Sequence, residues 1–482
     1  MKDSKLINLI ETFTKTEFRE FGMFVNSPYH NREKVMINFY NYLKRIYPVF
    51  SEKNLERRIV FSKIFSEKKF SETLFRNTVS DLLKLTENFV KLKHFENEKF
   101  YGQYLLLKEL TNRKQISLFK SNFKRADKIL NADNARDEIY FQNKFLLEDE
   151  WRRNHVVSSS KMLFKEDNLK NQSDSLHVYY LTEFTKLYAI LLNQSKFTYD
   201  YNFNYELFDA VIEYLRNNFT LYKEIPYINI FYNCVMLYKT DERIYFDELK
   251  KLLLRHYRIL TLTDRKNIFV VLINYSSDQI SKGNYSFIKE KFNINEHLLK
   301  SGAYFEGNDF MPHYFYESIA VNALEMKRFD WAEKFILKYK KIVHPDYKES
   351  SFNFCMAELF YRKGDTDNSL SFLSKVLPEN VKDRTKMNIL LLKIHYYCNN
   401  TVQFNSLIES SKKYILRNKN LQEDNKKQLA NFLSLLVKLY KIKNDSDHLH
   451  ELENLKKKIY DCTEFTEKKW LEEQVELIRL EN

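Results

Sequence analysis

The stretch PHYFYESIAVNALEMKRFDWAEKFILKYKKIVHP, residues 312–345, decides the fold class, because it has the pattern of two helices joined by a short polar turn. Two further units follow it with nearly the same spacing. Prolines 312, 345 and 378 recur every 33 residues, and the turn sites Lys327-Arg328, Lys363-Gly364 and Asn399-Asn400 recur every 36. The predicted helix pairs are 313–326 with 329–343, 349–362 with 366–377, and 382–398 with 402–417.

Composition extends this helical prediction to the whole chain. The 482 residues include only 6 glycines and 6 prolines, which sheets and tight loops use for their turns. Hydrophobic residues make up 44% and charged residues 30%, as is typical of folded proteins and not of disorder. We therefore predict an all-α protein in which an N-terminal helical bundle precedes an α-α superhelix. One helical hairpin cannot bury its own apolar face, so the hairpins must stack on their neighbours.

The three units resemble the tetratricopeptide repeat over residues of about 312–418. Residues that match the family's helix positions are Tyr316, Ile319, Ala320, Phe329, Ala332, Ile336 and Pro345 in the first unit, and Met356, Ala357, Phe360, Gly364 and Leu373 in the second. Ser369 stands where the family has a small alanine, and Lys393 replaces the small residue of the third unit's first helix.

This resemblance implies a concave groove that is formed by the first helix of each pair and binds a peptide or a partner helix. The groove-facing candidates that it implies are Glu317, Glu325, Phe354, Glu358, Tyr361 and Arg362. The leading functional prediction is therefore a protein–protein interaction scaffold without enzymatic activity.

The regions outside the repeats define the expected domain organisation. Residues 1–100 are predicted to form a basic helical bundle, 101–300 helical hairpins of degenerate repeats, 301–420 the tetratricopeptide-like repeats, and 421–482 capping helices near 424–443 and 464–480. In the first region, Thr14-Lys-Thr-Glu17 has the pattern of a capping box, and Asn31 is expected to cap a third helix. A fourth helix is expected over 72–95, with an apolar seam at Leu82, Leu85, Phe89 and Leu92.

The N-terminal region also resembles an uncharacterised family of long helical proteins. The similarity lies in the turn Ser27-Pro28-Tyr29-His30-Asn31, which follows the second helix. Strand-like alternation occurs at Tyr199, Tyr201, Phe203, Tyr205 and Leu207, where we expect a loop into a helix near Asn204. The alternative is a small hairpin or a strand edge for a bound peptide.

The motifs of common enzymes are missing from the sequence, so we predict no catalytic residues, cofactor or metal. Gly302-Ala-Tyr-Phe-Glu-Gly307 has half of the P-loop spacing but is followed by Asn308-Asp309, where that loop needs Lys and Ser or Thr. His448 and His450 lie two residues apart, and on a helix such side chains diverge by about 200°. A polar turn is the favoured interpretation of that segment.

The chain carries a formal net charge of +13, and residues 1–100 hold 19 basic and 13 acidic side chains. The alternative function is therefore nucleic-acid binding or regulation through this basic region. A codon bias towards Lys, Asn, Ile, Phe and Tyr is the favoured explanation of the excess, and the basic clusters lack interleaved stacking aromatics.

Cellular location follows from the cysteines and the N-terminus. Cys234, Cys355, Cys398 and Cys462 form no CxxC pair and are expected to lie in the core. The first residues lack the apolar run of a signal peptide, and the charge-free stretch 225–238 is shorter than the roughly 20 residues of a membrane span. We therefore expect a cytoplasmic protein whose partner is another protein or peptide.

Overall fold

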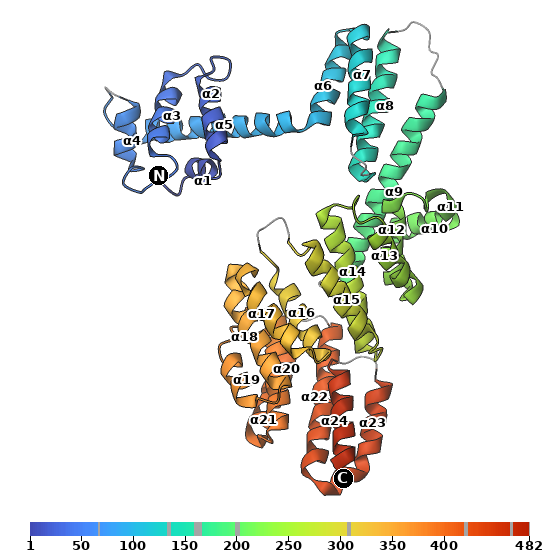
Figure 1. Cartoon of the computed structure of the whole chain (residues 1–482). Coiled ribbons are helices and arrows are strands. Elements are labelled where there is room, and N and C mark those ends of the chain that lie inside the picture. The colour runs from blue at the N-terminus through green and yellow to red at the C-terminus, as the bar shows by residue number, and fades with distance from the viewer. Residues whose placement is uncertain are drawn as a thin grey trace. The chain divides into compact units, whose positions relative to one another are not determined.

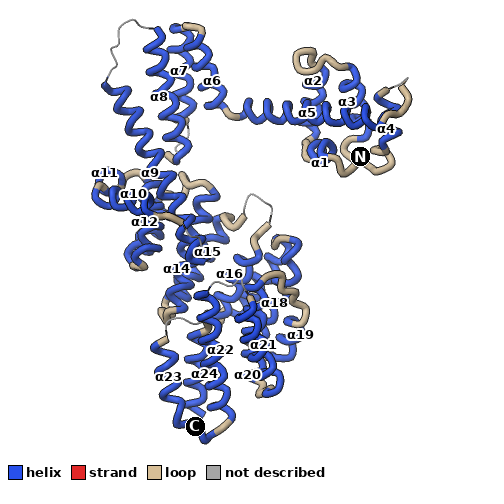
Figure 2. Tube along the Cα trace, turned by 180° about the vertical axis from the view of Figure 1, so that it is seen from behind, coloured by secondary structure: helices blue, strands red, loops and turns tan. Residues whose placement is uncertain are grey.

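The structure is a computed structural model that describes residues 1–65, 68–132, 136–158, 166–197, 203–305, 310–418, 423–462 and 466–481. Within these ranges the chain forms α-helices α1–α24 and two 3-10 helices, and it forms no strand (Figures 1 and 2). Met311 and Val343 make one isolated bridge. The prediction of an all-α protein is thus confirmed. No helix in the described ranges is both long and apolar enough to cross a membrane.

The chain divides into two compact units, and the division runs through helices α8 and α9. Unit 1 comprises Met1–Asp133 and Gln142–Asp174, and unit 2 comprises Asn134–Phe141 and Ser175–Asn482. These units group the residues differently from the four sequence-based regions, whose boundaries remain predictions.

The first part of unit 1 is a bundle of α1 (Lys5–Glu11), α2 (Lys15–Asn26), α3 (Lys34–Ile46), α4 (Arg57–Ile64) and α5 (Glu72–Asn97). The predicted capping box is confirmed, because Thr14 Oγ1 accepts the Glu17 N–H and Glu17 accepts the Thr14 N–H. The predicted cap at Asn31 is wrong. Its side-chain amide donates to the carbonyl of Val25, and Glu33 occupies the N-cap position of α3.

The apolar seam of α5 is only partly covered. Leu82 and Phe89 are buried against the bundle, whereas Leu92 is 37% exposed. Figure 1 shows α5 continuing beyond α1–α4 towards α6. The bundle therefore covers the first part of the predicted seam and leaves Leu92 partly exposed.

Four helices follow: α6 (Lys99–Asn112), α7 (Ile116–Leu130), α8 (Glu138–Ser158) and α9 (Glu166–Phe197). Thr111 on α6 and Asn154 on α8 are both buried, and the Asn154 amide donates to the Thr111 hydroxyl at 3.2 Å. In unit 2, the start of α8 is held to α9 and α14 by Lys186. Its ammonium lies 2.7 Å from carboxylate oxygens of both Glu138 and Asp264.

Unit 2 continues with α10 (Glu206–Asn217), α11 (Phe219–Tyr222), α12 (Pro226–Thr240), α13 (Arg243–Arg255), α14 (Leu262–Ser281) and α15 (Phe287–Ser301). Most of the charge-free stretch forms α12, whose side chains are largely buried in the main core. The alternating segment lies partly outside the described residues. From Phe203 onwards it leads into α10, and Asn204 Oδ1 accepts the Glu206 N–H at 2.9 Å.

The three predicted helix pairs are confirmed to within a few residues. They are α16 (His313–Glu325) with α17 (Phe329–Tyr339), α18 (Pro345–Arg362) with α19 (Thr366–Leu373), and α20 (Val381–Tyr397) with α21 (Thr401–Arg417). Each predicted turn holds one residue with positive φ: Lys327 at 57°, Gly364 at 83° and Asn399 at 56°. These residues reverse the chain in the left-handed conformation that ends many helices.

The chain ends with α22 (Glu423–Asn444), the 3-10 helix Ser446–Glu451, α23 (Leu452–Asp461) and α24 (Lys468–Glu481). Both views show α22, α23 and α24 side by side (Figures 1 and 2). Helices are confirmed near both predicted ranges, whereas the sequence pattern did not predict α23, whose Leu452, Leu455 and Ile459 are buried. The apolar faces of these helices join α20 and α21 in one core.

Candidate functional site

A groove runs along the first helices of the three repeated pairs. Its walls come from α14, α16, α18, α20 and α22 and from the segment that leads into α24. The groove has a volume of about 560 Å³, and its apolar lining includes Val321 on α16, Phe354 on α18 and Ile389 on α20. This volume lies within the range of about 300–1,000 Å³ that is typical of ligand pockets.

Three of the six predicted groove residues line this groove, namely Glu317, Phe354 and Glu358. All three are more than nine-tenths buried. Tyr361 and Arg362 lie further along α18. Tyr361 contacts Trp470 in the C-terminal segment, residues 466–481, and Arg362 contacts Glu358. Glu325 lies outside the groove lining, at the end of α16, where its charge acts on Arg362.

Glu317 is held by partners on both neighbouring helices of the groove. Ser351 on α18 donates its hydroxyl to one carboxylate oxygen at 2.6 Å, and Lys386 on α20 donates to the other at 2.8 Å. Burial disfavours the charged form of Lys386, but the carboxylates of Glu317 and Asp383 outweigh it and raise the lysine pKa. The charged lysine therefore joins α20 to α16 through Glu317.

A second chain of charges crosses from α18 to the C-terminal segment. Arg362 Nε donates to Glu358 at 3.4 Å, and Lys393 on α20 donates to Glu467 at 2.6 Å. Burial alone would raise the Glu467 pKa, but the charges of Lys393 and Arg362 and the Lys393 hydrogen bond lower it. Glu467 also has a φ of 63°, a left-handed conformation that costs backbone energy in a non-glycine residue.

Trp470, in the first turn of α24, anchors the C-terminal segment to the same helices. Its indole Nε1 donates to the Tyr361 hydroxyl at 2.8 Å. Its ring lies edge-on to Tyr396 of α20, with centroids 5.2 Å apart. Trp470 thus contacts α18 through its one N–H donor and α20 through its ring.

The sequence analysis missed Lys386, Glu467 and Trp470, because each meets its partner across a long stretch of chain. One signal was available at Lys393, which stands where the resemblance to the tetratricopeptide repeat implies a small residue. Lys393 is 2% exposed, and a lysine so placed on an apolar helix face needs a carboxylate to compensate it. The sequence did not identify that carboxylate as Glu467.

Other sequence features lie apart from this groove. Cys234 and Cys355 are buried as expected, but Cys398 is exposed and Cys462 half-buried, so the core prediction is wrong for these two. Gly302 ends α15 with a φ of 67°, and residues 306–309 of that glycine segment lie outside the described residues. His448 pairs with Glu451 at 2.9 Å in the 3-10 helix that replaces the predicted polar turn.

Basic side chains of the N-terminal bundle are partly neutralised by their neighbours. Arg57 pairs with Glu72, and Lys93 pairs with Glu20 at 2.5 Å. Nucleic-acid binding by residues 1–100 stays a prediction.

The described residues include no group of three or more His, Cys, Asp or Glu side chains that could hold a metal ion. The groove instead combines an apolar lining with carboxylates that already have basic partners. Binding there would draw its free energy chiefly from apolar contact, because the charges are already compensated. Models of known protein families, curated proteins and solved structures were compared with the chain, and none matches it.

Proposed function

We propose that the chain is a non-enzymatic protein–protein interaction scaffold. In this proposal the helix pairs α16–α21 form a tetratricopeptide-like solenoid, and its inner groove takes an extended segment or a helix of a partner protein. The turns at Lys327, Gly364 and Asn399 support the solenoid, because each reverses the chain by the same left-handed conformation at the same point of its helix pair. The proposal keeps the cytoplasmic location that the sequence predicts.

The observation that carries this proposal is that two helices of the groove, α18 and α20, already bind another segment of this chain. The C-terminal segment places the Glu467 carboxylate on Lys393 and the Trp470 indole on Tyr361. An acidic and an aromatic side chain three residues apart thus dock against α18 and α20. The open part of the groove, beside Phe354 and Val321, continues along these helices with an apolar lining. We infer that a partner offers apolar side chains to this part.

A blocking variant tests the groove directly. Ser318 lines the groove on α16 and is half-buried, so Ser318→Trp fills the space without removing a packed side chain. Ser371→Trp is the matched control, because Ser371 is exposed on α19 and outside the groove. Peptides are first selected on the native chain from a random library displayed on phage.

Selected peptides should bind the native chain and Ser371→Trp alike and lose about tenfold or more in affinity for Ser318→Trp, as expected when about 1.4 kcal/mol of apolar contact is removed. Circular dichroism of each variant checks that it is folded. If no peptide is enriched, or if the enriched peptides bind both tryptophan variants equally, the groove is not the docking surface.

A further inference from the structure

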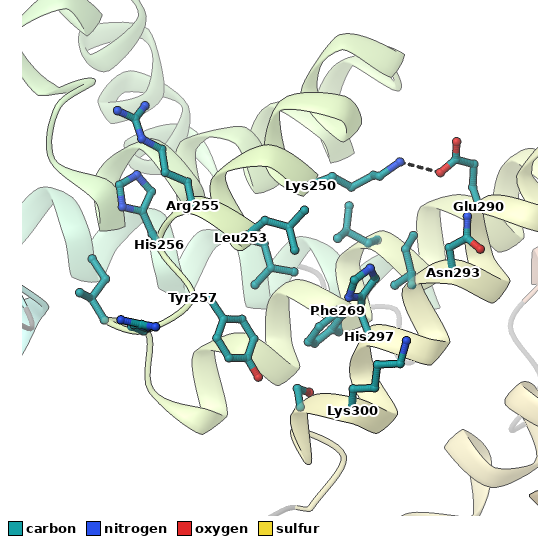
Figure 3. Close-up of a pocket in the computed structure, with 16 residues that line it drawn as sticks. Lys250, Leu253, Arg255, His256, Tyr257, Phe269, Glu290, Asn293, His297 and Lys300 are labelled. Atoms are coloured by element: carbon teal, nitrogen blue, oxygen red, sulfur yellow. Dashed lines mark hydrogen bonds and ion pairs between the residues drawn. The ribbon is translucent and has the colours of Figure 1, made fainter.

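A second cavity lies elsewhere in unit 2 and shares no lining residue with the groove. It has a volume of about 700 Å³ and is lined by the end of α13, the following turn at residues 256–259, α14 and α15 (Figure 3). Ligand cavities for small molecules usually measure about 300–1,000 Å³. The cavity is therefore large enough for a small organic molecule.

The floor of this cavity is apolar and belongs to the main core. Leu253 from α13, Phe269 and Leu272 from α14, and Ile294 from α15 line it, and each is buried. These side chains are fixed by packing on their other sides, so the floor is preformed. An apolar group that enters the cavity would remove this surface from water without a rearrangement of the core.

The walls carry an excess of positive charge. Lys250, Arg255, Arg258 and Lys300 line the cavity, and Glu290 is the sole carboxylate among its lining residues. Lys250 and Glu290 pair with each other at 2.5 Å. Within the described part of the chain, Arg255, Arg258 and Lys300 take part in no ion pair, so three cationic groups stay uncompensated.

The cationic and polar groups lie on more than one side of the cavity. Figure 3 shows His297 and Lys300 of α15 next to each other, with Tyr257 across the cavity from Lys300. A further guanidinium, that of Arg265, lies over the Tyr257 ring at 4.1 Å. Asn293 of α15 adds an amide that can donate hydrogen bonds. Polar and cationic groups from α15 and from the turn after α13 thus line opposite sides of the cavity.

We propose that this cavity binds a small organic anion with an apolar body, such as a medium-chain carboxylate. The apolar body lies on the floor of Leu253, Phe269 and Ile294, and the anionic group lies against the cationic walls, which Arg258 and Lys300 line. Charge complementarity selects an anion over a neutral or cationic amphiphile. The buried floor favours a small molecule over a nucleic-acid strand, which would contact only the cationic rim. This site is independent of the proposed peptide groove.

The first experiment compares three twelve-carbon probes that differ in head group: dodecanoate, dodecyl maltoside and dodecyltrimethylammonium. Each is titrated below its micelle concentration into the full-length chain, and binding is followed by calorimetry. Dodecanoate should bind with a stoichiometry of one and at least about tenfold more tightly than the other two, the equivalent of one charge-assisted hydrogen bond. Equal affinities for the three probes would overturn the proposal.

The second experiment removes two cavity charges and compares a variant with the same change in net charge. Arg258→Gln/Lys300→Gln alters the walls, whereas Lys251→Gln/Lys289→Gln alters exposed lysines of α13 and α15 outside the cavity. The first variant should bind dodecanoate at least about tenfold more weakly, and the second should match the native chain. Equal weakening in both would mean that net charge alone attracts the probe, which overturns the site.

Asn293→Trp provides an independent check, because Asn293 is exposed at the cavity and its replacement fills the space while the charges stay. Dodecanoate binding should be lost in this variant also. If a single-stranded oligonucleotide binds the native chain with loss on Arg258→Gln/Lys300→Gln, and dodecanoate does not bind, the surface is a nucleic-acid site and the proposal is wrong.

Discussion

The ammonium of Lys393 lies 2.6 Å from a carboxylate oxygen of Glu467, although 74 positions separate the two residues in the chain. Lys393 belongs to α20, the first helix of the third repeated pair, and Glu467 immediately precedes α24. The pair is therefore a tie between the repeated helices and the C-terminal helix. It also explains how a lysine that is only 2% exposed can occupy this position of α20.

Removing only one partner of this ion pair should destabilise the folded chain. Glu467→Ala leaves the Lys393 ammonium buried without its carboxylate, and we expect a loss of about 3 kcal/mol in the free energy of unfolding. Lys393→Met/Glu467→Met removes both charges and should lie within about 1 kcal/mol of the native chain. Urea unfolding measures both. If the double variant is as unstable as Glu467→Ala, the buried charge is not the cause.

The same pair should make stability depend on pH. The Glu467 pKa is lowered in the folded chain, from an ordinary value of 4.5. A lowered folded pKa means that the carboxylate stabilises the fold above about pH 4.5, and that this contribution is lost as pH falls through the folded pKa. Between pH 7 and pH 3, the native chain should therefore lose more stability than Glu467→Gln. If the free energy of unfolding falls by the same amount in the two proteins over this pH range, the assignment to Glu467 is contradicted.

The repeated turns predict stability changes of opposite sign for two substitutions. Lys327 is exposed with a φ of 57°, so Lys327→Gly should relieve left-handed strain and stabilise the chain by about 0.5–1 kcal/mol. Gly364 has a φ of 83°, and an added Cβ would meet no atom within 4 Å. Gly364→Ala should thus cost about 1 kcal/mol through backbone strain alone. Thermal unfolding of both variants checks the signs, and two changes in the same direction would refute the turn geometry.

In the N-terminal bundle, Gly22 lies where α2 crosses Tyr40 of α3. A Cβ at position 22 would overlap the Tyr40 phenol, whose hydroxyl donates to the Phe18 carbonyl at 3.2 Å. Gly22→Ala should cost about 2 kcal/mol by overpacking. Gly102→Ala is the matched control. Its Cβ would meet only the Phe95 ring at an ordinary 3.6 Å, so the variant should gain about 0.5–1 kcal/mol in helix propensity. Similar stability of the two variants would show that α2 and α3 are not this close.

Local features of the chain were predictable to within a few residues. Pro312 and Pro345 mark the beginnings of α16 and α18, and Lys327 marks the turn between α16 and α17. Thr14 caps α2 through a residue only three positions away. These features depend on hydrogen bonds and steric limits that act within about one helical turn, so the sequence expresses them directly.

The predicted groove residues came from the resemblance to the tetratricopeptide repeat, and three of the six line the groove. Glu317, Phe354 and Glu358 follow the helical period of α16 and α18, which places them towards one groove. Tyr361 and Arg362 have the same spacing, but the C-terminal segment and Glu358 engage them. Periodicity assigns a residue to a helix face and does not identify the segment that packs on that face.

The sequence by itself thus determined the all-α class of this protein, the three helix pairs within residues 312–418 and the turns that join them. Tertiary structure alone decided that Lys393 meets Glu467, that Trp470 meets Tyr361, and that α13, α14 and α15 enclose a cationic cavity. The physical reason is range. Backbone hydrogen bonding and φ preferences act between near neighbours in the chain, whereas ion pairs and cavities depend on how helices pack after long connections have closed.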